Sequence, residues 1–195
     1  MMMIRRMRMR VKNHDFWNNN FSSYIRREAS QKDQAQSYLS SILNATVYDV
    51  CIETPLQRAR GLSAELENDV YLKREDMQPV FSFKLRGAYN KLKRLVDSGD
   101  YPEAGVVACS AGNHAQGVAF SANELDVKAT IVMPLATPKI KVNSVKALGG
   151  KNVDVRLFGN NFDYAAEEAQ RLVKEEKMAM IHPFDDRDVI AGQGT

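Results

Sequence analysis

Residues 105–119 carry the sequence GVVACSAGNHAQGVA, in which a short apolar run leads through a turn into a helical pattern. The run at 106–109 is wholly apolar, as expected of a strand that is buried on both faces of a parallel sheet. Residues 113–125 then repeat small and apolar side chains at helical spacing. A strand that passes directly into a helix is the unit from which parallel sheets are built.

The same unit recurs toward the end of the chain. Strands are predicted at 129–133, 153–157 and 178–181, and helices at 137–149 and 162–177 lie between them. Alternating strands and helices with short links predict right-handed crossovers. The predicted fold class is therefore α/β, a three-layer parallel sheet with helices on both faces.

The pattern before residue 105 is less regular. Residues 31–44 form one apolar stripe and are predicted to be helical. Residues 54–56 are expected to be extended, residues 57–66 have a weak helical stripe, and residues 70–72 are predicted to form a short strand.

A second informative stretch is FSFKLRGAYN at residues 81–90. Pro79 disfavours helix immediately before it, and Ser82 is a suitable N-cap for a helix that runs to about Val96. This prediction places Lys84 in the first turn of the helix.

The neighbours of Lys84 in the sequence are the apolar residues Phe81, Phe83 and Leu85. Apolar neighbours and the positive end of a helix dipole disfavour the charged ammonium form of a lysine. A neutral amine can attack a carbonyl group and form a Schiff base. Taken alone, however, a lysine near a helix start is far more often a solvated side chain.

The turn SAGNHA at residues 110–115 lies where strand 106–109 passes into its helix, which is where open parallel sheets bind ligands. Gly112 allows a close approach of the backbone, and the free N–H groups of the first helical turn suit an anion. Asn113 adds an amide that both donates and accepts hydrogen bonds. An ordinary capping turn is the competing interpretation. Dinucleotide binding is weakly supported because the G-x-G-x-x-G pattern is absent.

The composition, 44% hydrophobic and 26% charged, is that of an ordinary soluble globular protein. No apolar run approaches the roughly 18 to 20 residues of a membrane span, so no membrane partner is predicted. Cys51 and Cys109 form no C-x-x-C pair and are expected to be reduced packing residues of an intracellular protein. The three histidines lack metal-ligand spacing, so no metal is expected.

Positive charge is concentrated at the start of the chain. Through Arg27 there are seven basic residues and one acid, a net charge of +6, so the remainder carries −3 of the total of +3. A slightly acidic folded part argues against a nucleic acid partner. Residues 1–30 are predicted to be a basic leader, a plastid or mitochondrial transit peptide. A disordered tail or an incorrectly chosen start codon are the alternatives, and the protein would then be cytoplasmic.

The two motifs, together with VIAGQGT at 189–195, resemble in order and spacing the biosynthetic threonine deaminases (threonine ammonia-lyases). KRED at 73–76 and IVMP at 131–134 resemble the same family, the serine/threonine dehydratase branch of the fold-type II pyridoxal phosphate enzymes. The resemblance covers roughly residues 45–195 and implies a fold similar to the β subunit of tryptophan synthase. QPVF at 78–81 is more similar to the biosynthetic than to the catabolic enzymes.

The resemblance implies roles for individual residues. Lys84 matches the lysine that holds pyridoxal 5′-phosphate covalently and acts in catalysis. Asn113 matches the asparagine that hydrogen-bonds the 3′-oxygen of the cofactor ring, and Phe83 matches a residue packed beside the cofactor. The loop that receives the substrate carboxylate, largely through backbone N–H groups, is matched by Ser110, Ala111, Gly112 and His114.

Two departures from the family accompany the match. Ala111 stands where related serine racemases carry a serine that acts as acid or base, and alanine cannot transfer a proton, so racemisation is not expected. No stretch matches the family's glycine-rich phosphate loop or its late serine or threonine facing the pyridine nitrogen. The folded part, residues 31–195, is therefore expected to be an N-terminal portion of the catalytic domain that is inactive alone. Apolar surface of its parallel sheet is expected to be left open.

For the complete protein, the resemblance implies conversion of L-threonine to 2-oxobutanoate and ammonia, the first committed step of isoleucine biosynthesis, by a homo-oligomer. L-Serine would give pyruvate by the same steps. A catabolic serine/threonine dehydratase, a non-catalytic truncated fragment and a nucleotide-binding half-domain are the alternatives.

Overall fold

The computed structural model describes residues 33–195. Two compact units divide the chain, Met1–Ser40 and Ser41–Thr195. Residues 33–43 are helical, which confirms the predicted helix over the part that is described. The predicted leader, residues 1–30, lies outside the described residues. All further elements belong to the second unit.

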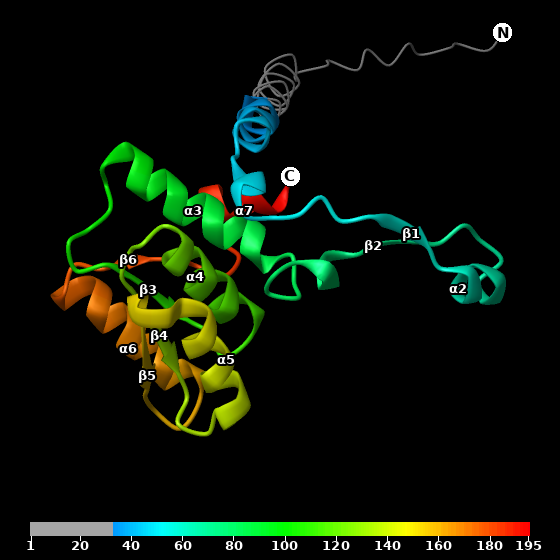
Figure 1. Cartoon of the computed structure of the whole chain (residues 1–195). Coiled ribbons are helices and arrows are strands. Elements are labelled where there is room, and N and C mark those ends of the chain that lie inside the picture. The colour runs from blue at the N-terminus through cyan, green and yellow to red at the C-terminus, as the bar shows by residue number, and fades with distance from the viewer. Residues whose placement is uncertain (1–32) are drawn as a thin grey trace, which may run out of the picture. The chain divides into compact units, whose positions relative to one another are not determined.

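The second unit is built around a four-stranded sheet in the order β5-β4-β3-β6 (Figure 1). All three strand pairings are parallel, as the sequence predicts. Three strands begin and end where they are predicted, whereas β6 is shorter at both ends. The strands are β3 (Val106–Cys109), β4 (Ala129–Met133), β5 (Val153–Leu157) and β6 (Ala179–Met180).

Five helices of this unit belong to the part around the sheet: α3 (Lys84–Ser98), α4 (Asn113–Glu124), α5 (Lys139–Gly149), α6 (Phe162–Glu175) and α7 (Arg187–Gln193). Three single turns of 3₁₀ helix accompany them: η1 (Val47–Asp49), η2 (Glu75–Met77) and η3 (Gly150–Asn152). No helix within residues 33–195 is long and apolar enough to pass through a membrane.

The contacts of alternate β3 side chains show which helices cover each face of the sheet. Val106 and Ala108 pack with side chains of α4 and α5, while Val107 and Cys109 pack with side chains of α6. Figure 1 shows α5 and α6 on opposite sides of the strands. All four β3 side chains are buried, which explains why this strand has no polar residue. The predicted three-layer α/β arrangement is therefore confirmed.

A separate antiparallel pair precedes α3. Strands β1 (Leu56–Arg58) and β2 (Tyr71–Lys73) pair with each other, and α2 (Arg60–Glu65) lies between them; we call residues 56–73 the β1–β2 arm. The helix predicted at 57–66 is wrong at residues 57 and 58, which belong to β1.

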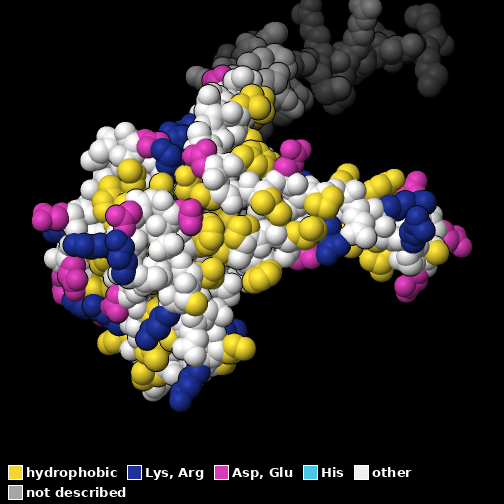
Figure 2. Space-filling view, in the orientation of Figure 1, with side chains coloured by type: hydrophobic (Ala, Val, Ile, Leu, Met, Phe, Trp, Pro, Cys, Tyr) yellow, Lys and Arg dark blue, Asp and Glu magenta, His cyan; other side chains and the backbone are white. Residues whose placement is uncertain are grey.

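Every residue of β1 and β2 is exposed, and Figure 2 shows hydrophobic side chains gathered along the arm. Among the large hydrophobic residues of these strands, Leu56 is the most exposed, at 65%. The parallel sheet, in contrast, is buried throughout β3 and β4. The expectation of an open apolar sheet surface is wrong for these strands, because helices of this same chain cover them.

Candidate active site

The N-terminus of α3 positions the first candidate residue. Lys84 is the first residue of the helix, and Phe83 occupies the N-cap position without a side-chain cap. The Ser82 hydroxyl, one residue earlier, accepts a hydrogen bond from the Lys84 backbone N–H at 3.2 Å. Ser82 therefore satisfies one free N–H group, as predicted, although the helix boundary lies one residue later than predicted.

The Lys84 side chain ends beside a backbone carbonyl. Its Nζ donates to the carbonyl oxygen of Pro183 at 2.6 Å and lies 5.3 Å from the centroid of the Phe83 ring. Leu85 points into the core, whereas Phe81 and Phe83 are exposed, Phe81 at 77%. The sequence predicted that apolar side chains surround Lys84. In the structure Phe81 is turned to solvent, and the partly exposed ring of Phe83 is the aromatic group near the amine.

The turn after β3 leaves the N-terminus of α4 open. Gly112 occupies the N-cap position without a side-chain cap, and a Cβ added to it would meet nothing within 4 Å. Ser110 and Ala111 are half-buried and Asn113 is exposed. The Ser110 hydroxyl accepts from the Gly112 N–H at 3.3 Å. Uncapped N–H groups at a helix start are suited to bind an anion.

His114 is buried in the first turn of α4, with 3% of its surface exposed. Its Nε2 lies 2.9 Å from the Ile181 carbonyl oxygen, which can only accept, so Nε2 carries the proton. Nδ1 is then a bare acceptor, and it is buried without a hydrogen-bond partner. Burial is the main cause that lowers the pKa of His114 to about 4, with a smaller contribution from the Lys84 charge. The imidazole is therefore neutral at physiological pH.

The segment Ile181–Pro183 brings the two motifs together. It follows β6 directly, and the Ile181 N–H donates to the Val107 carbonyl oxygen of β3 at 2.8 Å. Lys84 and His114 both donate to carbonyl groups of this segment. A Cβ added to Gly117 would lie 3.2 Å from the Lys84 carbonyl carbon, so the starts of α3 and α4 are in close contact. The predicted site residues thus meet at the carboxyl edge of the sheet, where parallel sheets bind ligands.

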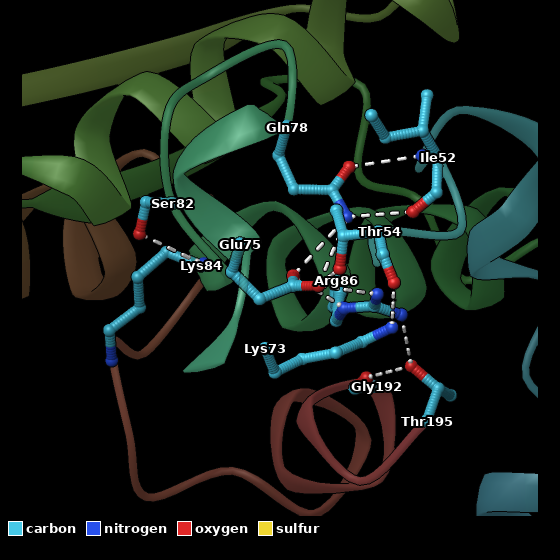
Figure 3. Close-up of polar contacts among 10 residues, drawn as sticks. All are labelled: Ile52, Thr54, Lys73, Glu75, Gln78, Ser82, Lys84, Arg86, Gly192 and Thr195. Atoms are coloured by element: carbon cyan, nitrogen blue, oxygen red, sulfur yellow. Dashed lines mark hydrogen bonds and ion pairs between the residues drawn. The ribbon is translucent and has the colours of Figure 1, made fainter. Parts of the chain in front are cut away.

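A buried ion pair behind the lysine was not predicted from the sequence. Arg86 is 3% exposed, and its Nε and one terminal nitrogen donate to the two Glu75 oxygens at 2.8 and 2.9 Å (Figure 3). These hydrogen bonds are the main cause that lowers the pKa of Glu75 to about 2. The position of Arg86 among the small and apolar residues Leu85, Gly87 and Ala88 was the signal that could have revealed the pair.

The edge of the sheet offers no metal site among the described residues. Across residues 33–195, no three His, Cys, Asp or Glu side chains are placed to hold an ion together. Cys51 and Cys109 are buried free thiols whose pKa values burial raises to about 11, which makes them packing residues. The chemistry available at the site includes that of the Lys84 amine, the Asn113 amide, the Ser110 hydroxyl, the neutral His114 imidazole and backbone N–H groups.

Known proteins are similar to this chain in sequence. The chain is 55% identical over 161 residues to the biosynthetic L-threonine dehydratase of Burkholderia multivorans, covering 83% of this chain and 31% of that protein. It is 50% identical over 173 residues to the mitochondrial threonine dehydratase of Saccharomyces cerevisiae, covering 89% of this chain and 29% of that protein. The chain thus spans about a third of the length of these curated relatives.

A solved structure gives the same result. The processed form of threonine deaminase isoform 2 from Solanum lycopersicum is similar, with a TM-score of 0.77 and 51% identity. The similarity covers 84% of this chain and 44% of that chain. The sequence profile of the pyridoxal-phosphate dependent enzymes matches residues 47–195, which is most of the chain. This chain therefore belongs to the family of pyridoxal-phosphate dependent enzymes.

Proposed function

We propose that a protein carrying this chain converts L-threonine to 2-oxobutanoate and ammonia with pyridoxal 5′-phosphate as cofactor. The observation that carries the proposal is the meeting of Lys84 with the uncapped start of α4 beside Ile181–Pro183. The names of the three similar proteins given above, two threonine dehydratases and one threonine deaminase, supply the substrate. Because the chain spans only about a third of these relatives, the activity is proposed for a longer protein.

The residues present fit the reactive end of the cofactor. An aldehyde needs an amine, which Lys84 offers, and a ring hydroxyl needs a hydrogen-bonding partner, which Asn113 offers from the exposed start of α4. The buried and unpartnered Nδ1 of His114 is an acceptor left over at the same edge. The Phe83 ring, close to the lysine amine, offers a flat apolar surface beside it.

The side chains at the site have different roles in the proposed elimination reaction. When bound, pyridoxal phosphate supplies an electron sink for negative charge that develops at the substrate α-carbon. Lys84, once its amine is free, is the base that removes the proton from that carbon. Ala111 has no group that transfers protons, so no acid or base comes from its side chain. The proton is therefore handled on the lysine side only, which suits elimination and disfavours racemisation.

The start of α4 is proposed to bind the substrate carboxylate. The helix has no side-chain cap, and the turn that leads into it, at Ser110, Ala111 and Gly112, is half-buried. A carboxylate at this position is stabilised by the N–H groups and by the positive end of the helix dipole. His114 contributes its backbone N–H to this turn, while its side chain is committed to Ile181.

The activity can be tested with a chimera. Residues 41–195 replace the corresponding third of the Burkholderia multivorans relative, which is 55% identical, and 2-oxobutanoate release from L-threonine is measured. We expect turnover that Lys84→Ala abolishes and that the matched control Lys139→Ala, at an exposed lysine, preserves. Equal activity of the Lys84→Ala chimera would contradict the proposal.

Residues 1–30 are proposed to direct import into an organelle. The supporting observations are the net charge of +6 through Arg27 and the mitochondrial threonine dehydratase of yeast among the relatives.

A further inference from the structure

We infer that Arg86 and Glu75 are a positioning pair that fixes the Lys84 amine at its working position. The inference rests on the proposed function, because it assigns a purpose to the place of Lys84. Neither residue points toward the amine. In Figure 3 the pair lies on one side of α3 and the Lys84 side chain extends away from it.

The ion pair of Arg86 and Glu75 fixes the first turn of α3 on the side opposite the Lys84 side chain. Lys84 and Arg86 are two positions apart, so their side chains leave the helix in widely different directions. The turn has no side-chain cap at Phe83, and it is approached through Phe81, a non-glycine residue with a φ of +56°. The hydrogen bond from the Lys84 N–H to the Ser82 hydroxyl is one local constraint on this helix start, and a helix start leaves further N–H groups without partners within the helix. The bidentate contact of Arg86 supplies a further constraint because its two hydrogen bonds set both distance and orientation.

The carboxylate partner is itself held in place. The Thr54 hydroxyl donates to Glu75 Oε1 at 2.6 Å, and the Gln78 amide donates to Glu75 Oε2 at 3.2 Å. The same Gln78 side chain exchanges two hydrogen bonds with the Ile52 backbone, at 3.0 and 2.9 Å. Glu75 is therefore anchored to the base of the β1–β2 arm, independently of α3.

Arg86 also reaches a third segment. Its remaining terminal nitrogen donates to the Thr195 hydroxyl at 3.1 Å, which in turn donates to the Gly192 carbonyl at 2.8 Å. The guanidinium carbon lies 5.3 Å from the centroid of the Tyr48 ring. One buried side chain thus connects the start of α3 with η2, with Thr195 after the end of α7 and with η1. Such convergence on a residue beside the reactive lysine exceeds what a surface ion pair provides.

The consequence concerns the contact between Lys84 and Pro183. If the pair is broken, the start of α3 is free to shift, and the amine loses its 2.6 Å hydrogen bond to the Pro183 carbonyl. A shift of this kind has opposite effects on two reactions of Lys84. The amine becomes more accessible to a small general reagent but less well placed toward the site that orients pyridoxal phosphate.

The experiment measures both reactions on the full chain, lysine by lysine, by mass spectrometry. Reductive methylation with formaldehyde reports general access, and pyridoxal phosphate followed by borohydride reports placement. Each Lys84 rate is divided by that of the exposed Lys139. For Glu75→Gln and for Arg86→Lys we expect methylation of Lys84 to rise about two- to tenfold, the factor for one lost hydrogen bond. We expect its labelling by pyridoxal phosphate to fall about tenfold.

Arg86→Lys keeps the charge but not the two-pronged contact, so it should not rescue the placement. The matched control is Arg94→Lys on the same helix, where the exposed Arg94 pairs with the half-buried Asp188, and it should leave both rates unchanged. Unfolding would raise both rates and is detected by circular dichroism. Unchanged methylation of Lys84 in folded Glu75→Gln would overturn the inference. A lack of preference of pyridoxal phosphate for Lys84 in the chimera described above would instead contradict the proposed function, whereas the methylation rates of the chain test the positioning pair separately.

Discussion

Gly192→Ala should destabilise the chain, because α3 and α7 cross where neither has room for another atom. A Cβ on Gly192 would lie 2.5 Å from the Arg86 carbonyl oxygen, 2.7 Å from the Asn90 Cβ and 2.8 Å from the Gly87 Cα. All three are backbone or Cβ atoms that cannot rotate away. Since non-bonded heavy atoms sit at about 3.5 Å, the helices must separate by up to about 1 Å.

Two effects of opposite sign decide the magnitude. Alanine is the better helix former by about 1 kcal/mol, which favours the variant. Overpacking of a tight interface costs about 1–3 kcal/mol, and with three rigid contacts the upper part of that range applies. The net expectation is a loss of about 1–2 kcal/mol in the free energy of unfolding.

Urea unfolding of the full chain, followed by circular dichroism, measures this loss. The matched control is Gly61→Ala in α2, where an added Cβ meets nothing within 4 Å, so only the gain in helix propensity remains. We expect that variant to equal or exceed the unaltered chain in stability. If Gly192→Ala is as stable as Gly61→Ala, the close crossing of α3 and α7 is wrong.

Three further predictions concern the site and the leader. Burial lowers the pKa of His114 from 6.5 to about 4, so its contribution to stability is complete above pH 6.5 and is lost as the pH falls toward 4, by up to about 3 kcal/mol. His114→Asn should therefore flatten the dependence of the unfolding free energy on pH in that window, and an unchanged slope would contradict the neutral buried imidazole. Asn113→Ala in the chimera should keep the cofactor bound yet shift its absorption and slow turnover, since one hydrogen bond is worth about 0.5–1.5 kcal/mol; unchanged spectrum and rate would make Asn113 a helix-start residue only. A fluorescent reporter that carries residues 1–45 should enter an organelle, whereas a diffuse cytosolic signal would favour the tail or wrong-start alternatives.

The strands of the sheet could be predicted because their burial is visible in the sequence of each strand by itself. Strands β3 and β4 are buried on both faces, so β3 is a continuous apolar run and β4 is apolar except for Thr130. In the β1–β2 arm, β2 (Tyr71–Lys73) was predicted as a strand one residue too early, at 70–72. Strand β1 was not predicted beyond an extended segment at 54–56, because its three residues are exposed and carry no alternating pattern. Helix α7 has only seven residues, and its clearest signal is Asp186, which accepts from the backbone N–H groups of Asp188 and Val189.

The site was predictable in part, because some of its residues belong to short sequence motifs. Lys84 and the turn at 110–114 stand out as motifs, and each lies at a helix start as expected. What the sequence does not contain is the partner of each group. Lys84 and Pro183 are 99 positions apart, and Arg86 finds Glu75 through the fold of the arm. The prediction that apolar residues surround Lys84 was wrong, because its sequence neighbours point in different directions: Leu85 into the core and Phe81 into solvent.

The place of the cofactor lysine is the most direct test of the account. Pyridoxal phosphate is added to the chimera, the adduct is reduced with borohydride, and the peptides are mapped by mass spectrometry. The account predicts one pyridoxyl group, on Lys84. A group on Lys73, Lys91 or Lys93 instead would contradict it.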